Sequence, residues 1–414
     1  MKRRAFPVIL VLFALGGFHA FGQDQSAQDV FDTSAFDQNV QQSKQQEQTA
    51  KLEYLFGGSF LSDNYLYTST AFNGYAAGGR FSGKAFTKVT VPDYGILYLG
   101  YNFSHNVYQG IGGTVPGGAG SFLSLSAGDL YDTTFSLSEF YVSFDIARTV
   151  FVRVGNQLIA WGPSAIWTPV DFINLQRLDP LSSLDLRVGK PGLRIHVPLG
   201  ISNLFLFGDF SGTVTPAGVQ DPFQKTNAAA RWDITVLGYE LALTGFWGAS
   251  NQNYGFDFSG RVLGFDVYGE LAAALPYDAS SSTFASSIGF QRFLGELSYW
   301  SIQGEFFYNG AGTTDTLGMI NAKTFTPFYA GTYYAYAGIT RSHLFIDGVS
   351  ASLSSFANLS DSSLLLRLST TIDLPKLVPF TFAISYAGGG ANREFTYFVG
   401  NNSLSADLQV RFSF

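Results

Sequence analysis

Few residues of this chain have the types and spacing that catalysis requires. Beyond residue 22 the histidines are His105, His196 and His343, and the sequence contains no cysteine. A thiolate nucleophile and a cysteine-ligated metal are therefore excluded, and no zinc-protease, serine-hydrolase or phosphate-loop motif occurs. We therefore expect no enzymatic activity, no cofactor and no metal ion.

Charged residues instead recur where they could act on a solute. The segment 153–200 carries both signs of charge and departs from simple strand alternation. Its candidate residues, which would form an ionic cluster if the segment folds inward, are Arg153, Asp171, Asp179, Arg187 and Arg194. Mixed charge in such a loop can narrow a passage and orient dipolar solutes. The alternative is a structural turn whose Asp and Asn residues cap a short helix and whose Arg residues neutralise carboxylates.

Further charges alternate along predicted strands. Arg231, Asp233 and Arg261 lie on the polar sides of segments 230–236 and 256–262. Together with neighbouring carboxylates they would form mixed-sign rings on an interior wall. Asp257, Asp266 and Glu270 are the neighbours that we expect there. The net charge of −7 and the pI near 5.1 give no basic footprint for nucleic acid.

The strands that would position these charges alternate with period two from Leu52 onward. A soluble β-sandwich would alternate in the same way. The segments are close to the ~9–11 residues of a tilted bilayer crossing, whereas sandwich strands are often nearer to ~5–6. Aromatic residues, 16% of the chain, gather near segment ends, as at Tyr299 and Trp300. These features favour a membrane barrel with its apolar face outward.

The last segment gives the sharpest pattern. Leu404, Ala406, Leu408, Val410, Phe412 and Phe414 alternate with Ser405, Asp407, Gln409, Arg411 and Ser413. The last strand of a barrel must pair with the first, because an open sheet edge cannot exist in hydrocarbon. This ending resembles the C-terminal assembly signal of bacterial outer-membrane barrels, and the resemblance implies that Phe412 and Phe414 are read by the insertion machinery.

The N-terminal region predicts export. Lys2, Arg3 and Arg4 precede an apolar run, and Ala20 to Gly22 fit a cleavage site, so we expect a signal peptide at 1–22. Residues 23–50 are Gln-rich and have little to bury, which predicts a flexible periplasmic tail or a short helix.

The remaining residues, 51–414, are predicted to form an all-β, transmembrane antiparallel β-barrel with an irregular excursion at 162–192. At roughly 20 to 25 residues per strand and connection, we expect about 16 strands, within a range of 14 to 18.

The segment 153–191 resembles a diffuse group of porin-type outer-membrane barrels. In that group Arg-x-Gly-x-Gln is followed by Trp-Gly, Pro-x-Asp-x-x-Asn, Asp-Pro and Arg-x-Gly-x-Pro. The matching residues are Arg153, Gly155, Gln157, Trp161, Gly162, Pro169, Asp171, Asn174, Asp179, Pro180, Arg187, Gly189 and Pro191. Leu175 stands where the group usually has Pro. The resemblance covers about a tenth of the chain and implies an outer-membrane barrel in a diderm bacterium, without a particular solute.

The leading functional hypothesis is a porin-like channel for passive diffusion of small solutes, filtered by the mixed charges. One alternative is a surface-exposed binding or adhesin barrel with a plugged lumen. Another is a hydrophobic-solute transporter, suggested by aromatics placed on the lumen side, among them Phe135, Tyr141 and Phe246. The expected partners are the lipid bilayer, the outer-membrane assembly machinery and small solutes, with no nucleic acid. The sequence shows no interface from which an oligomeric state could be read.

Overall fold

The computed structural model describes residues 52–72, 75–111, 133–174, 180–182, 184–212, 214–215, 218–219, 226–278, 281–295, 299–315, 325–375, 378–390, 393–396 and 402–414. The predicted signal peptide (1–22), the predicted tail (23–50) and Asp179 lie outside these residues.

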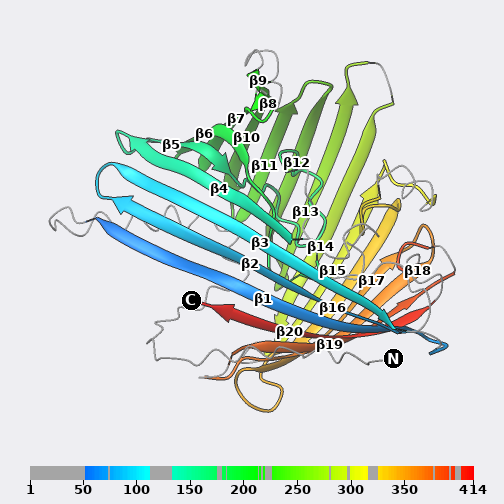
Figure 1. Ribbon diagram of the computed structural model, residues 1–414. Helices are drawn as coiled ribbons and strands as arrows, with labels where there is room; N and C mark the ends of the chain where they lie inside the picture. The colour runs from blue at the N-terminus through cyan, green and yellow to red at the C-terminus, as the bar shows by residue number, and fades with distance from the viewer. Residues whose placement is uncertain are drawn as a thin grey trace. The chain divides into compact units, whose positions relative to one another are not determined.

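Strands make up most of the described chain (Figure 1). They are β1 Glu53–Ser69, β2 Tyr75–Val91, β3 Gly95–Ile111, β4 Thr133–Ile146, β5 Val150–Gln157, β6 Lys190–Leu199, β7 Ser202–Asp209, β8 Val214–Thr215, β9 Gly218–Val219, β10 Asn227–Val236, β11 Tyr239–Trp247, β12 Asn251–Val262, β13 Phe265–Pro276, β14 Thr283–Leu294, β15 Trp300–Asn309, β16 Tyr333–Arg341, β17 Val349–Asn358, β18 Ser363–Ile372, β19 Phe380–Gly388 and β20 Ser403–Ser413. No helix among the described residues is long and apolar enough to cross a membrane.

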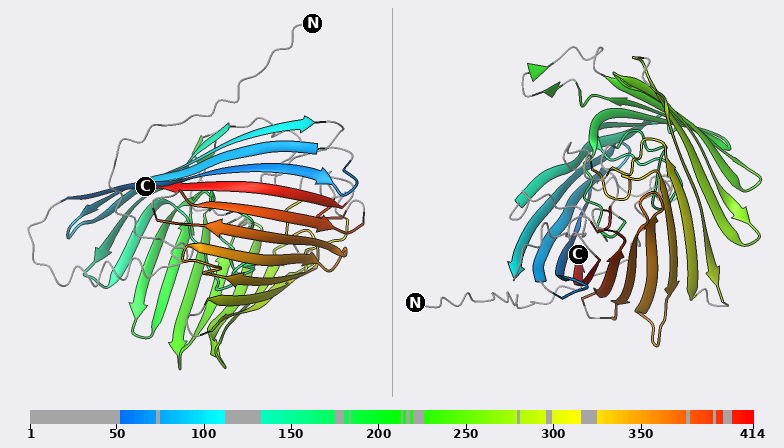
Figure 2. Two further views of the ribbon diagram at one scale, coloured as in Figure 1. Left: turned by 90° about the horizontal axis from the view of Figure 1, so that it is seen from below. Right: turned by 90° about the vertical axis from the view of Figure 1, so that its right-hand side faces the viewer.

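Eighteen of these strands form one closed antiparallel sheet, and β8 and β9 form a separate small hairpin. Each barrel strand pairs with the next, and β7 pairs with β10. β20 returns to pair with β1, and Figure 2 (left) shows the red last strand beside the blue first strand. The predicted all-β antiparallel barrel is confirmed. The 18 strands lie at the upper end of the expected range of 14 to 18 and exceed the expected number of about 16 by two, because several hairpins use very short turns.

Two such turns carry a clear local signal. Leu237 and Gly238 join β10 to β11, and Leu263 and Gly264 join β12 to β13, all four with positive φ. Positive φ at both central residues is the geometry of a type I′ hairpin turn, whose twist matches that of the strands. Such turns consume two residues, which brings the strand number to the upper end of the range that 20 to 25 residues per strand and connection allows.

The two faces of the sheet separate by polarity. In β20, Leu408 and Phe412 are exposed on the outer side, whereas Asp407 and Gln409 are buried on the inner side. In β12 and β13, Asp257 and Glu270 are cross-strand partners and both are buried. Large apolar side chains cover the outside, including Leu241, Leu243, Leu271, Ile288, Phe290, Phe306, Leu353, Leu368, Phe382 and Ile384. The predicted alternation therefore points its polar side into the barrel.

Connections differ in length between the two ends of the barrel. At one end the connections are short, such as Leu237–Gly238 and residues 147–149. At the other end they include the stretches 158–189, 310–332 and 389–402. Parts of these three long connections turn back into the barrel and contact its inner wall, as the hydrogen bonds described below show.

Candidate functional site

The described part of the connection between β5 and β6 lies inside the barrel. We call its described residues, 158–174, 180–182 and 184–189, the inner loop; none of them is in a strand. Its ends are fixed to β3 and β4: the Leu158 N–H donates to the Glu139 carboxylate (3.0 Å), and the Gly189 N–H donates to the Ser138 carbonyl (2.8 Å). The Asn102 amide also donates to the Leu186 carbonyl (2.7 Å).

Two carboxylates of another part of the wall hold the middle of the inner loop. Glu270 on β13 accepts the N–H groups of Ser164 (2.9 Å) and Val170 (3.0 Å). Glu305 on β15 accepts the N–H groups of three successive residues, 165–167, at 2.8–3.2 Å. Both carboxylates are almost fully buried. The inner loop therefore spans the interior from the β3–β5 wall to the β13–β15 wall.

Gly162 is required by this anchoring. Its φ is +104°, and a Cβ at this position would lie 2.3 Å from a carboxylate oxygen of Glu270. Any other residue would combine backbone strain with a clash against the anchor itself.

Two of the predicted cluster residues meet within the inner loop. Arg187 binds Asp185 through Nε (3.0 Å) and a terminal nitrogen (2.9 Å), and it lies 3.7 Å from Asp171. Burial alone would raise the pKa of Asp185, but the hydrogen bonds and charge of Arg187 hold this pKa below its usual value. Asp171 in turn accepts hydrogen bonds from Asn174. The charge of Arg187 compensates one of the two carboxylates, and the contacts of this group shape the loop.

Arg153 and Arg194 occupy a different place, on the inner wall. They are direct cross-strand partners on β5 and β6. The Arg153 guanidinium lies 4.2 Å above the Tyr141 ring, and that of Arg194 lies 5.1 Å from the Phe205 ring. No ion pair joins Arg153 to a carboxylate of the described residues. The structure thus divides the predicted cluster into a loop pair and a wall pair.

The remaining predicted wall charges each have an ion-pair or hydrogen-bond partner. Arg231 forms a two-point ion pair with Asp257, with one N–O distance of 2.9 Å. Asp233 accepts a hydrogen bond from Asn203 (2.9 Å). Arg261 pairs with Asp266 (2.7 Å), with 70% of its side chain exposed beside the short β12–β13 turn, so it lies away from the inner loop's anchors.

Two further inward segments, residues 325–332 and 393–396, were not anticipated from the sequence. Glu394 is fully buried and accepts hydrogen bonds from the Phe328 N–H (2.6 Å), the Tyr334 hydroxyl (2.6 Å) and the Asn358 amide (2.7 Å). Burial raises the pKa of Glu394 to about 7, although these hydrogen bonds oppose the shift. The Trp167 indole donates to the Phe328 carbonyl (2.8 Å) and so joins this group to the inner loop.

Apolar contacts fill part of the interior around these segments. Ile159, Trp161 and Ile173 of the inner loop pack against Phe205, Phe207 and Phe246 of the wall. Of the aromatics expected to face the lumen, Tyr141 and Phe246 do so. Phe135 does not: it is 70% exposed and paired with Phe103 on the outer face. The one-residue bulge beside Gly100 shifts the register between Phe135 and Tyr141, which alternation alone could not reveal.

The closed sheet, the polar inner face and the inward loop place this protein in the class of closed antiparallel β-barrels. No protein-family model matches the chain, and no curated protein matches it. Solved structures with the same fold include a BenF-like porin from Pseudomonas fluorescens Pf-5, at 10% identity and a TM-score of 0.54, covering 87% of this chain and 98% of that one.

Two further similar structures come from Pseudomonas aeruginosa. The outer membrane protein opdK matches at 10% identity and a TM-score of 0.51, over 87% of this chain and 99% of its own. OccK7 (OpdD) matches at 9% identity and a TM-score of 0.52, over 88% and 99%. At these identities the likeness establishes the fold, which is that of outer-membrane porin barrels.

Proposed function

We propose that the protein is a channel in the outer membrane of a diderm bacterium, through which small solutes diffuse passively. The apolar outer face suits acyl chains, and the polar inner face suits an enclosed aqueous lumen. The fold shared with a BenF-like porin and an outer membrane protein supports this location. The same likeness to porins supports a protein that performs no catalysis.

One observation carries the proposal: Arg153, on the inner wall, lies on the Tyr141 ring and has no carboxylate partner in the described chain. A structural arginine in a barrel wall is expected to be paired, as Arg231 is with Asp257. An arginine supported by an aromatic ring keeps its charge available to a passing solute. Its neighbour Arg194 adds a second charge at the same level.

In the proposed mechanism, the inner loop sets the width of the passage and wall charges filter what passes. The contacts of Arg187 with Asp185 and Asp171 fix the loop's shape, while Arg153 and Arg194 act on the solute. We further propose that residues 1–22 direct export, that residues 23–50 form a periplasmic tail, and that Phe412 and Phe414 serve the assembly machinery, for the sequence reasons given above.

The packing of the inner loop also favours a second candidate, a barrel with a plugged lumen that binds a partner at the surface. Trp167 is fully buried among Phe307, Tyr334 and the inward segments. A lumen closed by such contacts would pass no solute.

Swelling of proteoliposomes separates the two candidates. Vesicles containing the folded protein should swell in isotonic solutions of small sugars and amino acids, at rates that fall as solute size increases. Swelling no faster than that of protein-free vesicles, by a protein shown to be folded by its β-rich circular dichroism, would contradict the channel and favour the plugged barrel.

A further inference from the structure

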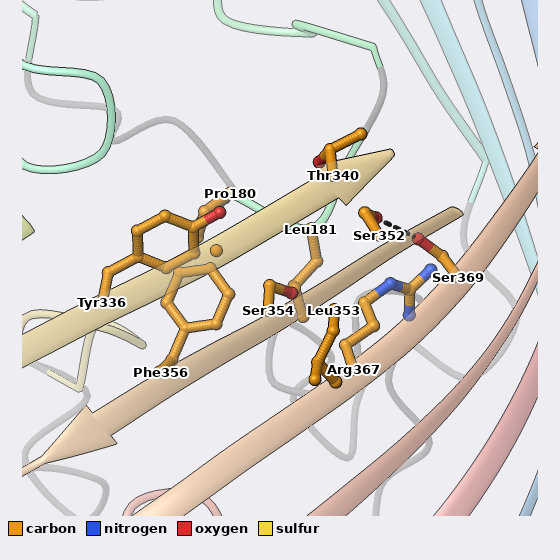
Figure 3. Close-up of a pocket in the computed structure, with 11 residues that line it drawn as sticks. Pro180, Leu181, Tyr336, Thr340, Ser352, Leu353, Ser354, Phe356, Arg367 and Ser369 are labelled. Carbon is orange, nitrogen blue, oxygen red and sulfur yellow. Dashed lines mark hydrogen bonds between the residues drawn. The ribbon is translucent and has the colours of Figure 1, made fainter. Parts of the chain in front are cut away.

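A pocket of about 210 Å³ lies between the inner loop and the inner faces of β16, β17 and β18. Figure 3 shows Pro180 and Leu181 of the inner loop above Tyr336 and Phe356 of the wall. Pockets for drug-sized ligands usually measure ~300–1,000 Å³, so this one suits a single small solute.

One side of the pocket is apolar and aromatic. The Tyr336 and Phe356 rings lie 4.8 Å apart between centroids, tilted by 47°. Leu181 and Pro180 face them from the inner loop (Figure 3). Rings and aliphatic groups in this arrangement offer a surface to the C–H face of a solute.

The other side carries hydroxyl groups. Among the described residues, the hydroxyls of Tyr336, Thr340 and Ser354 have no hydrogen-bond partner, whereas those of Ser352 and Ser369 bond to each other (2.7 Å). Each hydroxyl both donates and accepts a hydrogen bond. Three uncommitted hydroxyls beside an apolar surface match a solute that itself carries several hydroxyls.

The pocket offers little net charge. Among the described lining residues the one that is charged is Arg367, whose guanidinium binds both carboxylate oxygens of Asp407 (2.6 and 2.7 Å) and the Ser385 hydroxyl (3.2 Å). The charge of Arg367 is thus compensated within the wall. The described lining residues therefore offer no unpaired charge to an anion or a cation, in contrast to the wall around Arg153.

We propose that this pocket is a binding subsite for a neutral, hydroxyl-rich solute of about monosaccharide size, whose apolar face lies on Tyr336 and Phe356. The proposal rests on the channel function proposed above. Affinity at such a site is weak, because a solute in transit must leave as readily as it enters.

The dependence of the channel current on glucose concentration, recorded in planar bilayers with the full chain, tests the subsite. Glucose added to wild-type channels should reduce the current in a saturable manner. Tyr336→Phe and Ser354→Ala keep the packing and remove one hydroxyl each, and each should raise the half-saturating glucose concentration about three- to tenfold. The matched control is Ser136→Ala, a lumen-side serine on β4 outside the pocket, and it should leave that concentration unchanged.

Glucuronate, which adds a carboxylate to the same ring, tests the preference for a neutral solute. Glucuronate should bind no more tightly than glucose. Channels that conduct but respond to glucose without saturation, or equally in all variants, would overturn the subsite and leave the channel standing. Much tighter binding of glucuronate that is weakened by Tyr336→Phe would also overturn it, whereas binding that is weakened by Arg153→Ala belongs to the charged wall and leaves glucose saturation to decide on the subsite. A folded protein that gives no conductance would instead contradict the channel proposal itself.

Discussion

The carboxylate of Glu305 on β15 accepts the backbone N–H of Trp167, at 2.8 Å, from a loop that begins at the far wall of the barrel. The same carboxylate accepts the next two N–H groups toward the N-terminus and the hydroxyl of Tyr268 (3.0 Å). These four buried donors need hydrogen-bond acceptors, and the carboxylate takes the place of the water molecules that would otherwise accept from them. The position of the inner loop therefore depends on a wall residue more than 130 positions away in sequence.

Replacing Glu305 by Gln should release the inner loop. Both oxygens of Glu305 accept backbone N–H groups. The glutamine amide has one acceptor oxygen, and its NH₂ group cannot accept, so at least one backbone N–H loses its partner. We expect the free energy of unfolding to fall by about 1.5–3 kcal/mol, and single-channel currents to become noisier. Urea titration in lipid vesicles and bilayer recording measure the two effects. Ser301→Ala, on the same face of β15, is the control, and equal behaviour of the two variants would contradict the anchoring role.

Gly162→Ala should disturb the Glu270 anchor. The new Cβ would lie 2.3 Å from the carboxylate, in addition to the strain of a positive φ. Gly200→Ala is the matched control, because its φ is also positive (+72°) but nothing lies within 4 Å of the added atom. We expect the control to lose roughly 1 kcal/mol from strain and Gly162→Ala to lose clearly more in urea titration. Equal losses would show that the contact with Glu270 is unimportant.

Glu394 predicts a pH dependence of stability. Its pKa of about 7 in the folded protein exceeds its ordinary value of 4.5. The folded state then binds more protons than the unfolded state between these values, so the free energy of unfolding should fall as pH rises from about 4.5 to 7 and level off above. Glu394→Gln mimics the protonated group and should flatten this slope in urea titrations at several pH values. An unchanged slope in Glu394→Gln, with exposed Glu240→Gln as control, would contradict this assignment.

Arg153→Ala should change ion selectivity. Removing a lumen charge with no paired carboxylate lowers the local attraction for anions. The permeability ratio of chloride to potassium should fall by on the order of two- to threefold, an effect that weakens at high salt because of screening. Reversal potentials in a salt gradient give the ratio. Arg261→Ala, whose side chain is exposed and paired with Asp266, should change it little; a larger shift in this control than in Arg153→Ala would contradict the role of Arg153.

The alternation along single strands was predictable from the sequence, because it depends only on neighbouring residues. The inward Asp407 and the outward Leu408 of β20, and the inward sides of Asp257 and Glu270, follow from it. The strand number followed only as a range of 14 to 18, and the 18 strands lie at its upper end, since Leu237–Gly238 and Leu263–Gly264 make shorter connections than an average assumes. The bulge beside Gly100 likewise reversed the side predicted for Phe135.

The sequence allowed us to predict several residues of the site, but not which partners these residues contact. Asp171 and Arg187 were both candidates, and they do meet, but the closest partner of Arg187 is Asp185, two residues away, which no spacing rule singled out. Glu305 and Glu394 form their bonds with residues of distant loops, so their roles depend on the closure of the barrel. The only sequence signal was a carboxylate on the inner face of a strand or in a Gly-rich loop.

Single-channel recording in planar bilayers tests most directly whether the barrel encloses a continuous aqueous path. The purified, folded protein in potassium chloride should give stable steps whose size varies linearly with voltage and increases in Glu305→Gln. A folded protein that inserts into bilayers and gives no steps, in the wild type and in Glu305→Gln alike, would contradict the channel.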